Sequence, residues 1–159
     1  MKYIGLLVIF FAFQYTGYMI YLSKYNKTKR VEALSLLIRY IKQRSENFLE
    51  PLCEIYRSFY NIALDECGFL DELYKSDFAS AYDKFSDMFS LDDFTDNNIR
   101  VFASSLGKVP LKEHISSCDL IILEIETKSL EYIKALPREK KLWYGIGSLS
   151  GLFVVVLLL

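Results

Sequence analysis

Residues 3–22 read YIGLLVIFFAFQYTGYMIYL, and residues 142–159 read LWYGIGSLSGLFVVVLLL. Neither stretch contains an ionisable side chain other than tyrosine. A helix rises about 1.5 Å per residue and the hydrocarbon core of a bilayer is about 30 Å thick, so each stretch is close to the length needed to cross a membrane. The two stretches therefore predict one transmembrane helix at each end of this chain.

The first apolar stretch also has to be weighed as a cleavable signal peptide. Its apolar part is longer than the roughly 7–15 residues that are usual in a signal peptide. The residues near its end, Tyr15 to Tyr18, offer no pair of small residues for cleavage. We therefore interpret the stretch as a retained membrane helix.

Basic residues flank both apolar stretches on the side of the middle region. They are Lys24, Lys27, Lys29 and Arg30 after the first stretch, and Lys134, Arg138, Lys140 and Lys141 before the second. Because Lys and Arg accumulate on the cytoplasmic side of membrane helices, both ends predict a cytoplasmic middle domain. The sequence thus predicts an integral membrane protein with membrane helices at 3–22 and 142–159 and a cytoplasmic helical bundle at 24–141.

The middle region is acidic and has few cysteines. All 20 acidic residues lie within 31–141, together with all but five of the 19 lysines and arginines. An acidic domain gives no electrostatic reason to expect binding to nucleic acid. The three cysteines, Cys53, Cys67 and Cys118, form no C-x-x-C motif, so we interpret them as small apolar residues and not as a disulfide framework or a zinc site.

Apolar residues recur at helical spacing through most of the middle region. The pattern predicts helices from Val31 to about Glu50, from Pro51 to Gly68, over about 78–89 after an N-cap at Asp77, and from an N-cap at Thr95 to a stop at Gly107. The predicted fold class is all-α, a membrane-anchored antiparallel helical bundle with one transmembrane helix at each end.

The last predicted helix of the middle domain carries a seam in which residues are spaced alternately by four and three. The seam consists of Leu111, Ile115, Cys118, Ile122, Ile125, Ser129, Tyr132 and Leu136. Such a seam packs one helix along another. Pro137 follows directly, and it is expected to kink or break the helix there.

No motif in the chain predicts catalysis, a cofactor or a metal site. His114 and Cys118 share a helical face, but two ligands do not make a metal site. The polar cluster at 92–98 lacks the spacing of an EF-hand loop, and GIGSLSG at 145–151 has neither a preceding strand nor the lysine of a phosphate-binding loop. We therefore expect a protein that is not an enzyme.

Two faces of the apolar stretches are predicted to pack against protein. Gly147, Ser150 and Gly151 form a small-residue face that allows another helix to approach closely. Gln14 and Gly17 share a face of the first stretch, and a glutamine amide in hydrocarbon needs a partner. We predict that these two faces meet, within one chain or between chains; the alternative is that the glycines only allow flexibility near the headgroups.

Acidic residues dominate the segment from Asp65 to Asp96. The simplest interpretation is a solvated surface that also avoids anionic lipid. The alternative is a docking surface for a basic cytoplasmic partner. Its candidate residues are Asp71, Glu72, Asp83, Asp87, Asp92 and Asp93.

Taken in order along the chain, these features resemble stage III sporulation protein AB of endospore-forming bacteria. The features are YTGY at 15–18 in the first membrane helix, a helical middle, the stretch from Phe94 to Gly107, His114-Ile115, and GSLSG at 147–151 before a final Leu/Val run. The resemblance spans nearly the whole chain, and the order of the motifs carries it.

This resemblance implies a non-enzymatic component of the mother cell to forespore channel complex, located in the mother-cell membrane around the forespore. The family's cytoplasmic domain is similar to the F-type platform domains of type II secretion systems. The resemblance therefore implies a membrane platform whose helical domain docks other complex members, such as a secretion-type ATPase. A doubly anchored regulatory or sensor protein unrelated to secretion is the alternative, and a homo-oligomer is compatible with either interpretation.

Overall fold

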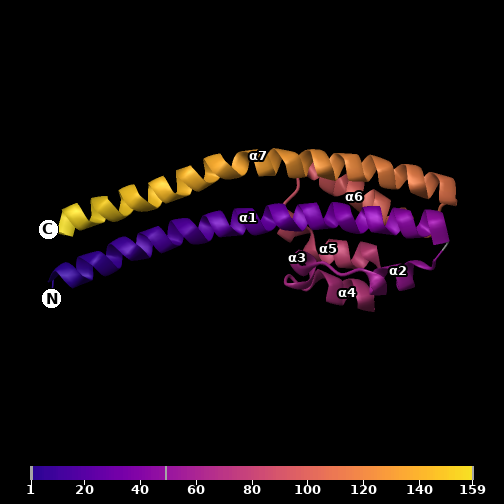
Figure 1. Cartoon of the computed structure of the whole chain (residues 1–159), viewed down its shortest axis with the longest axis horizontal. Coiled ribbons are helices and arrows are strands. Elements are labelled where there is room, and N and C mark those ends of the chain that lie inside the picture. The colour runs from indigo at the N-terminus through magenta and orange to yellow at the C-terminus, as the bar shows by residue number, and fades with distance from the viewer. Residues whose placement is uncertain (1, 49, 159) are drawn as a thin grey trace. The chain divides into compact units, whose positions relative to one another are not determined.

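The structure is a computed structural model that describes residues 2–48 and 50–158, and its regular elements in these ranges are all helices (Figure 1). They are α1 (Lys2–Phe48), α2 (Leu52–Ser58), α3 (Ile62–Asp65), α4 (Phe69–Lys75), α5 (Phe78–Phe89), α6 (Asp93–Ser105) and α7 (Leu111–Leu158). The predicted all-α class is confirmed. The chain divides into two compact units, which we call the hairpin unit (Met1–Asn26 with Tyr132–Leu159) and the helical domain (Lys27–Glu131).

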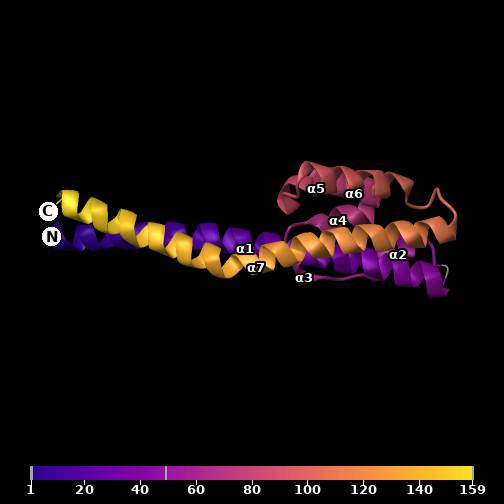
Figure 2. The same cartoon turned by 90° about the horizontal axis from the view of Figure 1, so that it is seen from above.

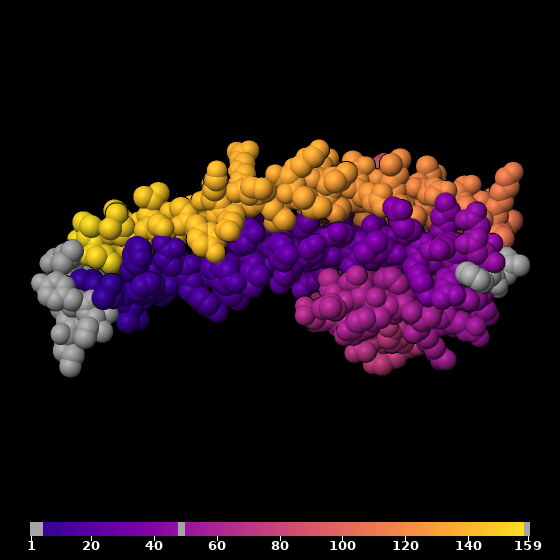
Figure 3. Space-filling model, viewed as in Figure 1, coloured from indigo at the N-terminus to yellow at the C-terminus, as the bar shows by residue number. Residues whose placement is uncertain are grey.

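The hairpin unit consists of the first part of α1 and the last part of α7. The two segments run antiparallel and side by side in both ribbon views, and they abut in the space-filling view (Figures 1, 2 and 3). Gly17 lies against Trp143, and Gly151 lies against Phe10. By length and composition, α1 and α7 are both long and apolar enough to cross a membrane.

The helical domain is built on the second part of α1 and the first part of α7. Ion pairs join these two helices, from Lys42 to Asp119 at 2.6 Å and from Arg39 to Glu126. Helices α4, α5 and α6 pack in succession, α4 on α5 and α5 on α6. The short helices α2 and α3 connect this layer to α1.

The core of the helical domain combines aliphatic residues of α1 with aromatic residues of α4 and α5. The predicted apolar face of α1 is fully buried at Val31, Leu34, Leu37, Ile38 and Ile41. Burial of one such side chain stabilises a fold by roughly 1.5–3 kcal/mol. Phe69 contacts Phe78 and Phe89 edge to face, and Tyr82 stacks on both of these rings.

The predicted seam of α7 is buried over most of its length within the helical domain. Cys118, Ile122, Ile125 and Ser129 are buried. Leu111, at the start of the helix, is 41% exposed, so close packing begins only after the first turn. The heptad-like spacing therefore identified the packed face of this helix.

The single helix predicted from Pro51 to Gly68 is wrong, because the structure has two short helices there. Phe59 is extended (φ −88°, ψ 135°) and its carbonyl accepts a hydrogen bond from the Tyr74 hydroxyl at 2.8 Å. The Asn61 side chain then caps α3 by accepting from the backbone N–H of Ala63. These local polar contacts compete with the helical backbone bonds that the apolar spacing suggested. Helix α4 was not predicted.

The predicted N-cap of the next long helix is displaced by three residues. Asp92, not Thr95, caps α6, and its carboxylate accepts from the backbone N–H and the hydroxyl of Thr95. Thr95 is instead buried in the first turn. Two other predicted signals are confirmed: Asp77 caps α5, and Gly107, at φ +75°, follows the last turn of α6.

Pro137 was expected to kink or break the helix; α7 continues through it, so the helix is not broken there. A proline removes one backbone N–H and crowds the preceding turn, but a long helix with neighbours can accommodate that loss. Contacts of Glu139 and Trp143 with the first part of α1 hold the turns that follow the proline.

Candidate functional site

Glycines bring the two helices of the hairpin unit into backbone contact. A Cβ atom on Gly17 would lie 2.5 Å from the carbonyl oxygen of Trp143, and one on Gly147 would lie 2.9 Å from the carbonyl oxygen of Phe13. A Cβ atom on Gly151 would lie 2.9 Å from the Phe10 ring. Real Cβ atoms do not tolerate such distances to backbone, so side chains at Gly17 and Gly147 would push the helices apart. By contrast, a Cβ on Gly145 would meet open space.

The Gln14 amide finds its partner across the same contact. Its Nε2 donates to the Ser148 hydroxyl at 2.5 Å, and that hydroxyl donates to the Tyr144 carbonyl at 2.9 Å. The structure thus brings Gln14, Gly17, Gly147 and Gly151 together within one chain, and Ser150 is half-buried beside them. Packing of these faces in a membrane stays a prediction.

Aromatic and charged residues follow the glycine contact on the side of the basic residues. The rings of Tyr18 and Tyr21 both lie edge-on to Tyr144. Trp143 Nε1 donates to Glu139 at 2.7 Å, and Glu139 also lies 3.9 Å from Lys24. Sequence reasoning missed these pairings, although Trp and Tyr beside Lys and Arg are typical of a membrane interface.

The six candidate residues of the acidic surface do not behave alike. Three of them hold cations of the chain itself: Glu72 pairs with Lys84, Asp83 with Arg100, and Asp92 with Lys128. The other three, Asp71, Asp87 and Asp93, are exposed and have no ion pair with the described residues. Much of the acidic segment therefore stabilises the contacts of α4, α5 and α6 with their neighbours.

An exposed apolar groove lies between α6 and α7 in the helical domain, with a volume of about 410 Å³. On α6 it is lined by Phe94, Asn98, Val101, Phe102 and Ser105, and on α7 by Ser117, Leu120, Ile121 and Glu124. Phe94 is 71% exposed, Val101 61% and Leu120 68%. Large apolar side chains are thus left in water on two adjacent helices.

The sequence contained a signal for this groove that was not used. Phe94 and Val101 lie seven residues apart, off the face of α6 that holds Ile99 and Phe102. Leu120 likewise lies off the seam of α7. An amphipathic helix with apolar residues on a second face has a second surface to cover.

His114 and Cys118 form a buried pair that is not activated for chemistry. The His114 Nε2 and Cys118 Sγ atoms are 3.8 Å apart, and the imidazole stacks on Phe102. Burial raises the pKa of the Cys118 thiol to about 12 and lowers the pKa of His114. At neutral pH both groups are therefore uncharged, and a protonated thiol is a poor nucleophile and metal ligand. The described residues contain no group of three or more His, Cys, Asp or Glu that could hold a metal ion.

A smaller hollow of about 210 Å³ opens beside this pair. It is lined by Ser45, Glu50, Leu52, Gly107, Val109, Leu111 and His114. Glu50 is engaged by Arg44 at 3.0 Å. The hollow contains few groups that could orient a ligand.

The structure defines a class of all-helical protein with two features. Two of its helices are long and apolar enough to cross a membrane, and its compact helical domain has an exposed apolar groove. Comparison with models of protein families matches residues 2–159 to stage III sporulation protein AB. The chain belongs to this family of sporulation proteins. Searches of curated proteins and of solved structures find no match.

Proposed function

We propose that this protein is a non-enzymatic membrane platform of the mother cell to forespore channel complex. In this proposal the hairpin unit anchors the protein in the mother-cell membrane around the forespore. The helical domain lies in the cytoplasm and docks other members of the complex, such as a secretion-type ATPase. The family assignment supports the sporulation role, and the basic residues beside both apolar stretches support the cytoplasmic location.

The groove between α6 and α7 is the observation that carries the docking role. The groove residues of α6 follow one face of that helix over three turns. They include Phe94, Asn98, Val101 and Ser105. Exposed apolar area flanked by polar residues is characteristic of protein interaction sites, and a groove between two helices accepts a third helix. The Asn98 amide bonded to Glu124 at 3.0 Å supplies a polar group that fixes orientation.

Site-specific photo-crosslinking in sporulating cells tests this docking surface. A photoreactive phenylalanine analogue replaces Val101 in one strain and Ile62 in another, because Ile62 is exposed to the same degree (63%) but lies in α3. We expect an adduct with another channel-complex protein from position 101 and not from position 62. No adduct from position 101, or the same adducts from both positions, would contradict the proposal.

A regulatory or sensor protein is favoured by one observation only, the hollow beside His114. A sensor would hold a small ligand there, next to Ser45 and Glu50. This candidate predicts that a substitution filling the hollow, such as Val109→Trp, abolishes function while the photo-adduct from position 101 is absent. The platform predicts that the adduct is present in the wild-type background.

A further inference from the structure

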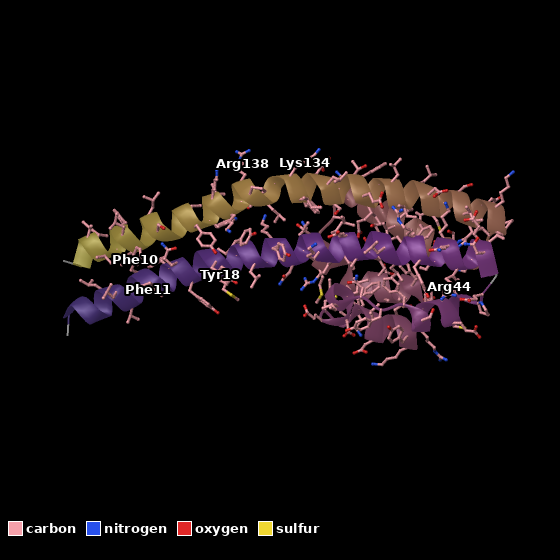
Figure 4. All side chains as sticks on the ribbon, viewed as in Figure 1. Phe10, Phe11, Tyr18, Arg44, Lys134 and Arg138 are labelled. Atoms are coloured by element: carbon pink, nitrogen blue, oxygen red, sulfur yellow. The ribbon has the colours of Figure 1, made fainter. Side chains whose placement is uncertain are left out.

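Three exposed cations occupy one face of α7 just before its apolar end. Lys134, Arg138 and Lys141 are all exposed, and they form no ion pair with the described residues. At about 100° per residue they fall within about 60° of the helix circumference. Lys134 and Arg138 point away from α1 in Figure 4. We call these three residues the cationic face.

Neither carboxylate next to the cationic face forms an ion pair with it: Glu131, one turn before Lys134, lies 3.6 Å from Lys128, and Glu139 is turned to the other side of the helix. Glu139 lies about 140° around the helix from Lys134. It faces α1, where it accepts from Trp143 and lies 3.9 Å from Lys24. Glu139 is the only acidic residue of the hairpin unit. The positive charge of the cationic face is therefore not neutralised by its own surroundings.

We propose that the cationic face binds the phosphate headgroups of anionic phospholipid. Three observations select lipid as the partner: no carboxylate of the described residues pairs with the three cations, the face begins about two turns before the apolar run at 142–159, and exposed apolar residues continue it toward the C-terminus. Leu149, which is 70% exposed, lies about 20° around the helix from Arg138 and about 12 Å along it from Lys141. A phospholipid would thus lay its headgroup on the cations and its chains along residues such as Leu149.

This inference rests on the membrane location in the proposed function, and tryptophan quenching can separate the two. The chain has a single tryptophan, Trp143, so the double substitution Trp143→Phe with Leu149→Trp places the only reporter on the lipid side of the cationic face. The full-length protein is reconstituted into bilayers that contain brominated phosphatidylglycerol or brominated phosphatidylcholine. Quenching by each lipid gives its relative occupancy beside the reporter.

We expect brominated phosphatidylglycerol to be preferred by about fivefold, which matches the attraction of one cation near an anionic surface. The preference should fall at high salt because the screening length shortens. The preference for phosphatidylglycerol should disappear in a variant that also carries Lys134→Gln, Arg138→Gln and Lys141→Gln. The matched control removes three exposed lysines of the helical domain and should leave the lipid preference unchanged. Its substitutions are Lys75→Gln, Lys108→Gln and Lys112→Gln.

Equal quenching by the two lipids, or a preference that survives loss of the three cations, would overturn the lipid inference while leaving the membrane location intact. Quenching by neither lipid would contradict the membrane location itself, and the lipid inference would fail with it. Quenching by phosphatidylcholine in the triple variant also shows that its last helix has inserted into the bilayer.

Discussion

At the scale of single residues, burial decides which groups can titrate. His114 is 6% exposed and packs between the Phe102 ring and the Cys118 thiol. Desolvation disfavours the imidazolium ion, which lowers the pKa of His114 in the folded protein. The unfolded chain keeps a histidine pKa of about 6.5.

This difference predicts a stability that falls in mild acid. Above about pH 6.5 both states carry neutral imidazole, and the contribution is fully present; as the pH falls below that value the unfolded chain takes up a proton that the folded chain resists. We expect the free energy of unfolding of the full-length protein in detergent, measured with urea, to decrease between about pH 6.5 and 5, by at most about 1.4 kcal/mol per pH unit.

The variant His114→Phe keeps a ring against Phe102 and removes the titration. Its unfolding free energy should be flat over the same interval. An equal slope in both proteins would show that other groups cause the pH dependence. The pKa of the Asp77 carboxyl is lowered by the backbone N–H of Ser80, and the pKa of the Asp92 carboxyl is lowered by Lys128. Both carboxylates stabilise the fold throughout this interval and lose that contribution only as the pH falls below about 4.

At the scale of elements, the helices that could be predicted from the sequence are those whose apolar residues recur on one helical face. The buried faces of α1 and α7 follow from spacing alone, and so do the cap at Asp77 and the stop at Gly107. The division between α2 and α3 cannot be predicted from spacing, because it depends on a hydrogen bond from the Tyr74 hydroxyl to the Phe59 carbonyl, fifteen residues away in the chain. Likewise, Asp92 and Thr95 are both good caps, and only tertiary packing, which buries Thr95, selects Asp92.

The helix contact of the hairpin unit could be predicted from the sequence, whereas the groove between α6 and α7 could not. A small-residue face and a lone glutamine are visible in sequence, and the structure places Gln14 opposite Ser148 and Gly17 opposite Trp143. The groove at Phe94, Val101 and Leu120 required knowing that α6 and α7 are neighbours. Spacing within one helix does not contain that information.

The hairpin contact predicts a sharp difference between two neighbouring glycines. Gly147→Leu should separate the helices, since even a Cβ would lie 2.9 Å from the Phe13 carbonyl oxygen, whereas Gly145→Leu projects into open space. We expect the first variant alone to lose crosslinking between cysteines introduced at Phe10 and Gly151 in a background with Cys53, Cys67 and Cys118 replaced by serine. Equal crosslinking of the two variants in membranes would contradict the predicted packing.

At the scale of the whole molecule, the proposal requires the helical domain to be cytoplasmic. Cys53 is exposed and Cys67 half-exposed, while Cys118 is buried, so Cys53 is the most sensitive natural reporter. An impermeant maleimide should leave Cys53 unlabelled in intact cells and label it after permeabilisation. Labelling in intact cells would place the helical domain on the outside and reverse the proposed orientation.

The platform role makes the strongest demand on the molecule as a whole, because an anchor without partners is not a platform. Exposed apolar side chains at Val101 and Leu120 are costly in water unless another protein covers them. A charged pair of substitutions, Val101→Asp with Leu120→Asp, should therefore leave the fold intact and weaken partner binding. Ile62→Asp, at an equally exposed position in α3, is the matched control.

Affinity purification of the tagged full-length protein from sporulating cells in mild detergent, followed by quantitative mass spectrometry, tests the platform most directly. The proposal predicts that the wild-type protein and the Ile62→Asp variant recover the other channel-complex proteins and the secretion-type ATPase, and that the groove variant recovers them at least tenfold less. Recovery of neither by the wild-type protein, or undiminished recovery by the groove variant, would contradict it.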